Sequence, residues 1–180
     1  MVNALFFELE TSLGNIEIEL FKDSAPKTCE NFIAYLKAGY YENTSFFRIV
    51  NKSHAQQGAE VKIEVVQGGP KFSSQGHDPK RMLQPLIHES TDITGLKHLS
   101  GSIAMGRFAA NESYGGFFFC IGDQPELNAG GKRFSDGKGT AVFAQLTKGK
   151  AILQQIFSCA EHNEMLEKEI VIFRITALNE

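Results

Sequence analysis

The sequence predicts a mainly β protein, folded as an antiparallel barrel or sandwich. Eight short segments have the apolar or alternating patterns typical of strands, and only two have the apolar spacing of helices. The helices do not alternate with the strands as βαβ units, which argues against a doubly wound parallel sheet. The 180 residues contain no internal repeat and no linker-like segment, so we expect residues 1–180 to form a single domain.

The first two expected strands form a hairpin, and the second of them alternates strictly between polar and apolar residues. The other strands are short apolar runs that end at glycine, proline or polar residues. Gly68, Gly69 and Pro70 are expected to break the fourth strand. The predicted strands are residues 5–10, 15–20, 45–50, 61–67, 101–105, 117–121, 141–146 and 169–178. The intervening segments 51–60, 71–95, 107–116 and 123–139 are expected to be loops or irregular.

Two amphipathic helices are predicted. The first spans residues 26–38: proline is favoured in the first turn of a helix, and Gly39 ends it. Its apolar residues recur at helical spacing, and they are Cys29, Phe32, Ile33 and Leu36. The second helix spans residues 148–158, with Ile152, Leu153 and Ile156 on one face.

Composition limits the partners and the compartment. The net charge is −3 and no run of lysine or arginine stands out, so nucleic acid is not an expected partner. No stretch approaches the roughly 20 apolar residues of a membrane span. The three cysteines form no CxxC motif and no disulfide framework, which favours a reducing compartment. We expect a cytoplasmic protein, or a periplasmic one if a leader has been trimmed.

Arg48 is the first candidate functional residue, because it is a charged residue inside an apolar strand. Two-residue periodicity predicts that Phe46, Arg48 and Val50 share one face of the strand. An isolated arginine of this kind belongs to the solvated face of an edge strand or serves a groove. Gln67 is the second candidate: it can cap the turn at Gly68, or it can lie where the backbone approaches a ligand closely.

Other reactive side chains give weaker signals. The five histidines have no metal-ligand spacing, and they are His54, His77, His88, His98 and His162. His98 is close to Ser100 in sequence, but the chain lacks the Gly-x-Ser-x-Gly motif of serine hydrolases. Cys120 lies in an apolar run and is expected to be an inert core thiol. The glutamates at positions 161, 164, 167 and 169 are expected to form a solvated face.

The order of several motifs carries more information than any one of them. Phe-Phe-Arg-Ile-Val at 46–50 is followed by Val-Val-Gln-Gly-Gly at 65–69, Ser-Ile-Ala-Met at 102–105 and Phe-Phe-Phe-Cys at 117–120. This series resembles the cyclophilin family of peptidyl-prolyl isomerases over nearly the whole chain, and residues 121–127 look most like its bacterial branch. The resemblance implies an eight-stranded antiparallel closed barrel capped by two α-helices.

The resemblance also implies site residues. Arg48 falls on the catalytic arginine of the family, and Gln67 falls on the glutamine beside it. Phe118 falls on the floor of the proline pocket, while Leu127 and Val65 fall on its apolar lining. Arg107 and Phe108 fall on a substrate-facing loop, where Phe108 is bulkier than usual.

At several positions the chain departs from the family pattern. Glu64 replaces a pocket phenylalanine, and Thr140 replaces a histidine at the pocket rim. Phe47 stands where many members have histidine, and Gly116 stands where they have glutamine. Glu126 stands where some members carry the tryptophan that contacts cyclosporin, so weak cyclosporin binding is expected.

The implied activity is acceleration of rotation about Xaa-Pro bonds, in proline-containing peptide segments or unfolded proteins, and it requires no cofactor and no metal. The alternative is a proline-peptide binding module of the same shape with weak or no catalysis, because Glu64, Gly116 and Thr140 alter the pocket wall. A third reading is a chaperone-like subunit of a larger assembly that makes contacts through the long loop at 71–95; we expect a monomer instead.

Overall fold

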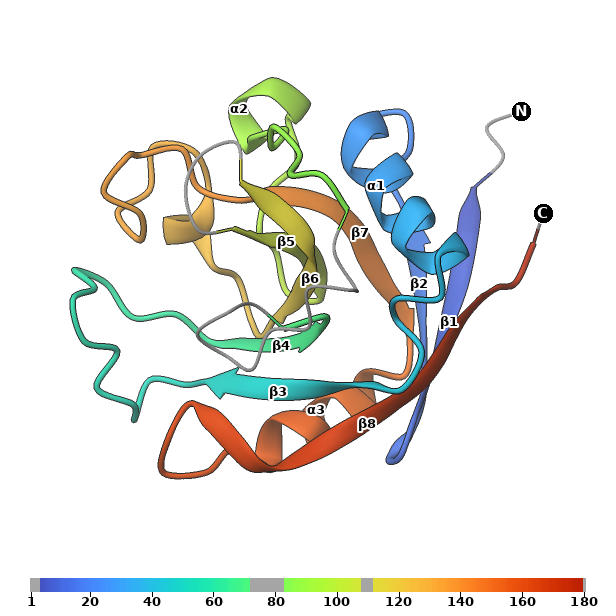
Figure 1. The fold of residues 1–180 in the computed structure, drawn as a ribbon. Helices are drawn as coiled ribbons and strands as arrows, with labels where there is room; N and C mark the ends of the chain where they lie inside the picture. The colour runs from blue at the N-terminus through green and yellow to red at the C-terminus, as the bar shows by residue number, and fades with distance from the viewer. Residues whose placement is uncertain (1–3, 72–82, 108–111, 180) are drawn as a thin grey trace.

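The computed structural model describes residues 4–71, 83–107 and 112–179 (Figure 1). Within these ranges, eight strands, three α-helices and one 3-10 helix, η3, follow one another. Their bounds are β1 Leu5–Thr11, β2 Gly14–Leu20, α1 Pro26–Lys37, β3 Thr44–Val50, β4 Val65–Gly69, α2 Thr91–Thr94, β5 Ser102–Arg107, β6 Ser113–Cys120, η3 Pro125–Leu127, β7 Ala141–Lys148, α3 Lys150–Ser158 and β8 Met165–Ala177.

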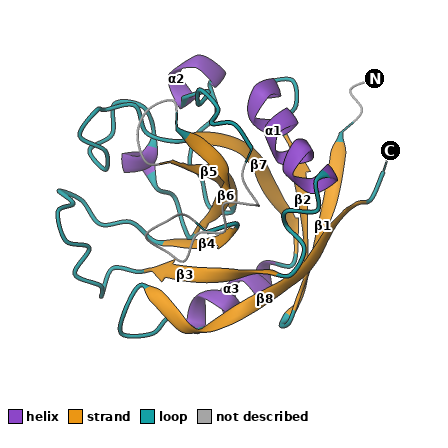
Figure 2. Cartoon of the chain, in the orientation of Figure 1, coloured by secondary structure: helices purple, strands orange, loops and turns teal. Residues whose placement is uncertain are grey.

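The strands close into one antiparallel barrel in the order β1-β2-β7-β5-β6-β4-β3-β8. Helix α1 packs against β6 and β7, and helix α3 packs against β2 and β4. The two helices lie on opposite sides of the barrel (Figure 2). The barrel rather than the sandwich is therefore correct, and the two longer helices occupy the predicted segments.

Aromatic side chains fill the interior of the barrel. The ring of Phe32 of α1 packs among them, with its centroid 5.0 Å from that of Tyr41, 5.4 Å from Phe143 and 5.7 Å from Phe7. Such tilted and edge-to-face pairs add to the free energy gained by burying the rings. The apolar spacing that predicted α1 is thus explained: Phe32 and Cys29 are fully buried against the barrel.

Strand β4 differs from its prediction at both ends. It continues through Gly68 and Gly69, because the ring of Phe46 covers Gly68 so closely that a Cβ would lie 2.7 Å from it. Only glycine lets the neighbouring strand and that ring come together there. The strand begins at Val65 instead of residue 61, because the side chain of Gln56 hydrogen-bonds both the N–H and the C=O of Ile63 and takes the place of a strand partner.

Other predicted bounds were also wrong. Helix α2 is a single turn within the segment 71–95, which was predicted as loop; residues 72–82 of that segment lie outside the described residues. Strand β6 begins at Ser113, in a segment predicted to be irregular, and β8 begins at Met165. Helix α3 starts at Lys150, two positions after the predicted start.

A second apolar cluster lies on the outside of the barrel. Its strand residues belong to the face opposite the aromatic interior, and loops 51–64 and 121–140 contribute to it. Its buried members are Val50, Ile63, Val65, Ala104, Phe118, Cys120, Leu127 and Val142. We call this set the outer cluster.

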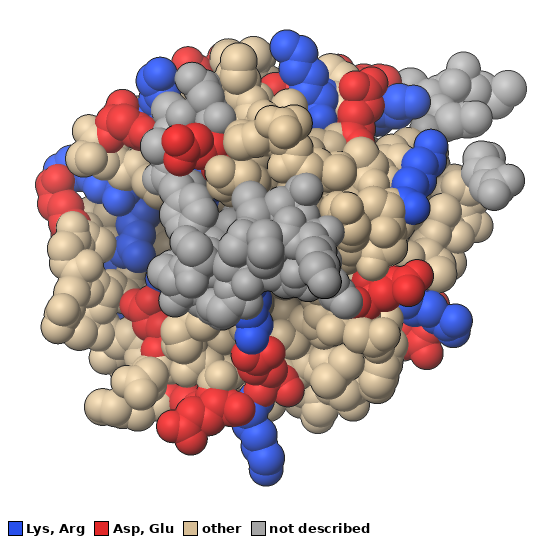
Figure 3. Space-filling view, in the orientation of Figure 1, with Lys and Arg blue, Asp and Glu red and all other residues tan. Residues whose placement is uncertain are grey.

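On the face shown in Figure 3, basic and acidic side chains are mixed. Within the described ranges, none of the helices has the length and hydropathy needed to cross a bilayer.

Candidate active site

Three of the predicted site residues form a row across neighbouring strands. Arg48 of β3 is the register partner of Gln67 of β4, and Gln67 is the partner of Phe118 of β6. Register partners project from the same face of a sheet, and adjacent strands lie about 4.8 Å apart. The fold therefore places a guanidinium, an amide and an aromatic ring side by side on the outer face.

A β-bulge at Phe47 sets the direction of Arg48. The β3–β4 register shifts between Phe46 and Arg48, so the side chains there do not follow strict alternation. Phe46 belongs to the aromatic interior together with Ile49. The prediction that Phe46 and Arg48 share a face was wrong for this reason, since two-residue periodicity assumes an unbroken ladder.

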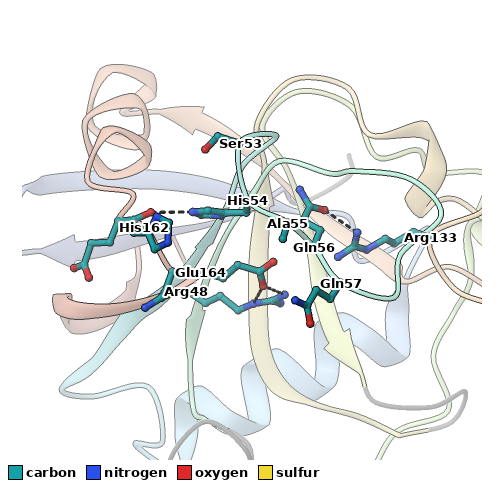
Figure 4. A pocket seen from close by; sticks show the side chains of 11 residues that line it. Arg48, Ser53, His54, Ala55, Gln56, Gln57, Arg133, His162 and Glu164 are labelled. Atoms are coloured by element: carbon teal, nitrogen blue, oxygen red, sulfur yellow. Dashed lines mark hydrogen bonds and ion pairs between the residues drawn. The ribbon is translucent and has the colours of Figure 1, made fainter.

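The guanidinium of Arg48 is held from two sides. Its Nη1 donates to Oε1 of Gln67 at 3.1 Å, and its Nε and Nη2 donate to Oε2 of Glu164 at 3.0 and 2.6 Å. Figure 4 shows the Arg48–Glu164 contact. Both side chains of the ion pair are about a quarter exposed, so the arginine is accessible yet fixed in orientation.

Glu164 was predicted to lie on a solvated face, and that prediction was wrong. It precedes β8, whose first residue Met165 is the register partner of Arg48. A contact between residues 116 positions apart in sequence leaves no local pattern. Only the closure of β8 against β3 brings the carboxylate to the arginine.

The predicted apolar lining of the site is assembled but buried. Phe118 is 7% exposed, Leu127 is 1% exposed and Val65 is 2% exposed. All three belong to the outer cluster, and Phe134 packs against that cluster from loop 121–140. Phe134 was not among the predicted site residues.

His98 supports the ring of Phe118. The two rings are stacked with an interplanar angle of 7° and a centroid distance of 6.3 Å. Nδ1 of His98 donates to Oδ1 of Asn128 at 2.8 Å, and Nε2 accepts from the hydroxyl of Thr140 at 2.7 Å. Burial lowers the pKa of His98 to about 4, so the imidazole is neutral at neutral pH.

Thr140 was predicted at the rim of the pocket, and the structure places it beneath the floor instead. It is 1% exposed, and its hydroxyl faces His98. The threonine takes part in the hydrogen-bonded support of Phe118. It does not form an open wall.

Arg107 was predicted on a substrate-facing loop, but it is the last residue of β5 and its side chain is 1% exposed. Nη1 and Nη2 donate to the two carboxylate oxygens of Asp136 at 2.9 and 2.8 Å, and Nε donates to the carbonyl of Gly139. Its guanidinium carbon lies 4.1 Å from the centre of the Phe134 ring. Arg107 therefore fastens loop 121–140 over the outer cluster. Phe108, predicted beside it, lies outside the described residues.

Among the described residues, no hydrogen bond or ion pair joins the Glu64 side chain to Arg48 or Gln67. The Glu64 carboxylate lies 3.5 Å from Nζ of Lys52, and the residue is not part of the outer cluster. Glu126 accepts a hydrogen bond from the backbone N–H of Lys132. Among the side chains that the structure describes, no group of three or more histidine, cysteine, aspartate or glutamate residues is arranged to bind a metal ion.

Comparison with solved structures first defines the class of fold. A cyclophilin-type peptidyl-prolyl cis-trans isomerase of Cryptosporidium parvum, crystallised in the presence of the dipeptide Ala-Pro, superimposes with a TM-score of 0.75. The match covers 97% of this chain and 99% of that chain at 23% identity. The closed barrel is therefore the cyclophilin fold.

Sequence comparison then defines the family. The profile described as cyclophilin type peptidyl-prolyl cis-trans isomerase/CLD matches residues 6–177. Peptidyl-prolyl cis-trans isomerase B of Escherichia coli is 30% identical over 172 residues, covering 92% of this chain and 95% of that protein. An isomerase of Streptomyces antibioticus is 33% identical over 156 residues, covering 83% and 81%. The chain belongs to the cyclophilin-type peptidyl-prolyl cis-trans isomerases, as its motifs indicated.

Proposed function

We propose that this chain accelerates rotation about Xaa-Pro bonds with Arg48 as the catalytic residue. The observation that supports this most directly is the row formed by Arg48, Gln67 and Phe118 on one face of three adjacent strands. It places a fixed cation next to an apolar cluster of a few side chains, against which Phe134 packs. A proline ring and the peptide bond before it present the complementary features, an apolar ring and hydrogen-bond acceptors.

The chemistry follows from the nature of the amide bond. Rotation breaks amide resonance, which gives a barrier of about 18–20 kcal/mol. In the twisted transition state the proline nitrogen regains a lone pair, so a donor directed at that nitrogen binds more strongly there than in the ground state. Arginine suits this role because it stays protonated and offers several N–H donors. Gln67 orients the guanidinium by accepting from Nη1.

Phe118, Leu127 and Val65 would hold the proline ring while the preceding residue turns. These side chains are almost fully buried, and Phe134 packs against them. We therefore propose that the entering proline displaces the ring of Phe134. His98 and Thr140 keep the floor in place during this exchange.

A binding module with weak catalysis is the second candidate. The observation in its favour is the Glu164 carboxylate, which already occupies two donor groups of Arg48. If that ion pair persists with peptide bound, fewer donors remain for the proline nitrogen. Peptide binding and catalysis therefore have to be measured separately.

The remaining functional expectations are also proposals. The Cryptosporidium parvum relative was crystallised with Ala-Pro, which supports proline-containing segments as ligands of this chain. We propose a monomer. We also propose weak cyclosporin affinity, because Glu126 offers a carboxylate engaged with its own turn where other members carry an indole. We propose a cytoplasmic location, or a periplasmic one if a leader is removed. The three free thiols of Cys29, Cys120 and Cys159 support a reducing compartment.

Exchange spectroscopy on a capped Xaa-Pro peptide tests the proposed activity. We expect the wild-type protein to accelerate exchange and Arg48→Ala to abolish most of the acceleration. Arg174→Ala is the matched control, since Arg174 is an exposed arginine of β8 that pairs with Glu10. Peptide titration of the same samples separates the two candidates: binding without accelerated exchange in the wild type would support the binding module.

A further inference from the structure

A polar cavity of about 760 Å³ opens beside the catalytic candidate Arg48. It lies between loop 51–64, the turn before β8 and the side chain of Arg133 (Figure 4). Its lining contains no residue of the outer cluster, so it is separate from the proposed proline-binding surface. Of its lining, the proposed function uses only Arg48 and the carboxylate paired with it, Glu164.

Hydrogen bonds fix the walls of this cavity to one another. His54 accepts from the backbone N–H of Asn51 and donates through Nε2 to the carbonyl of Glu161 at 2.9 Å, which joins loop 51–64 to the turn before β8. Nη1 of Arg133 donates to Oε1 of Gln56 at 2.7 Å and to the carbonyl of Val61 at 2.9 Å. Three segments far apart in sequence therefore form one preorganised site.

The charges in the cavity favour an anion. Arg48 is paired with Glu164, whereas Arg133 has no ion-pair partner among the described residues. The other acid in the lining, Glu161, directs its carboxylate to the backbone N–H groups of Glu167 and Lys168. The guanidinium groups of Arg48 and Arg133 thus face one available carboxylate, that of Glu164. Because Arg133 is half-buried and hydrogen-bonds only neutral acceptors, it attracts a second carboxylate.

The cavity is within reach of a peptide bound at Arg48. The guanidinium of Arg48 borders the cavity and also contacts Gln67 of the proposed catalytic row. An extended peptide advances about 3.3–3.6 Å per residue. Side chains one or two positions from the proline can therefore enter the cavity, where Ser53, Gln57 and Asn163 add polar groups to the lining.

From this geometry we propose that the cavity is a subsite for an acidic side chain of the substrate, within two residues of the proline. Arg133 is the residue that binds the carboxylate and determines the specificity. This inference rests on the proposed isomerase activity, because the peptide has to be anchored at Arg48. It adds to that activity a preferred class of substrate.

A capped peptide series tests the inference. Each peptide has one proline and alanines, with Glu, Gln or Lys at one of the two positions before or after the proline. Both ends are blocked, so the side chain carries the only carboxylate. We expect at least one position where kcat/KM for Glu exceeds that for Gln by about 5-fold, as the strength of a partly exposed ion pair allows. Lys at that position should rank below Gln.

Variants of the protein assign the preference to Arg133. Arg133→Gln should bring the Glu-to-Gln ratio close to one, Arg133→Lys should restore part of it, and Arg133→Glu should favour the Lys peptide. Lys132→Gln is the matched control: it removes the same charge one residue away, from a side chain that faces Glu60. It should keep the wild-type ratio.

The outcomes separate this inference from the proposed activity. If the wild type accelerates no peptide, the proposed activity itself fails. If it accelerates the Gln peptides but the Glu-to-Gln ratio is near one at every position, only the acidic subsite is refuted. The acidic subsite at Arg133 is also refuted if Lys132→Gln removes the preference for the Glu peptide as fully as Arg133→Gln does.

Discussion

The ion pair between Arg48 and Glu164 allows a quantitative prediction for Glu164→Gln. The wild-type carboxylate lies 2.6 Å from Nη2 and about a quarter of each side chain is exposed. Partly exposed pairs of this kind contribute up to about 1 kcal/mol. The substituted glutamine keeps an oxygen that accepts from Nε of Arg48, so the side chains at positions 67 and 164 still orient the guanidinium. The positive charge of Arg48 is then no longer offset by a carboxylate.

More of that charge then acts on the proline nitrogen in the transition state. An energy of about 1 kcal/mol corresponds to a rate factor of about 5, so kcat/KM of Glu164→Gln should rise by up to that factor. The free energy of unfolding should fall by no more than about 1 kcal/mol. Peptide exchange spectroscopy and urea denaturation measure the two quantities.

Glu167→Gln serves as the control, because it removes the same charge from an exposed residue in the same region. It should change neither quantity. A fall in kcat/KM of Glu164→Gln by 5-fold or more would refute the reasoning, since it would mean that the negative charge of Glu164 is needed for catalysis.

Four further predictions follow from the packing around the site. Burial lowers the pKa of His98 from 6.5 to about 4. As the pH falls, His98 is therefore protonated in the unfolded chain at a higher pH than in the folded protein. Stability should therefore decrease between pH 6.5 and 4 by up to about 3 kcal/mol, and urea denaturation of His98→Gln should show a correspondingly smaller pH dependence. Gly68→Ala places a Cβ 2.7 Å from Phe46 and 2.9 Å from the carbonyl of Ser45, and should lower the free energy of unfolding by about 2 kcal/mol or more. Its control is Gly58→Ala, where the new Cβ lies in open space at φ +78° and the free energy of unfolding should fall by about 1 kcal/mol. Phe134→Ala should lower KM by about 5-fold, because the entering proline no longer displaces a ring stacked on Arg107; an increase in KM would show that Phe134 is part of the binding surface. Native protein should react with a thiol reagent at Cys159 only, since Cys29 and Cys120 are buried and burial raises the pKa of Cys29 to about 12; mass spectrometry counts the modified thiols.

Much of the fold could be predicted from local patterns. Alternation identified the hairpin of β1 and β2, and the helical spacing of Cys29 and Phe32 identified α1. These patterns work because each element buries one face against the same interior. Choosing between barrel and sandwich needed the family resemblance, since closure of the sheet depends on pairings such as β1 with β8 that leave no local trace.

The predictions that were wrong have physical causes, which act between residues far apart in the sequence. Glycines usually end strands, but Gly68 and Gly69 continue β4 because Phe46 and Phe117 occupy the space of their missing side chains. Period-two reasoning failed at Phe47, where a bulge turns Arg48 away from the interior.

The site could be predicted only in part. Arg48, Gln67 and Phe118 were found through the family resemblance of the motif series, and the fold places them on adjacent strands of the sheet. Glu164, Phe134 and Asp136 were missed, because they reach the site from loops and turns whose sequences are polar and unpatterned. Arg107 holds the loop that carries Phe134 in place, so that Phe134 joins the outer cluster. Strand patterns alone do not reveal such a contribution from a loop.

The central claim is that Arg48 lowers the barrier to rotation as well as contacting the peptide. Its most direct test is kcat for Arg48→Ala, measured by exchange spectroscopy at saturating Xaa-Pro peptide. Removing one preorganised donor typically reduces kcat by about 100-fold or more, and we predict a loss of this size while the peptide still binds. An unchanged kcat at saturation, with only the affinity reduced, would contradict the claim.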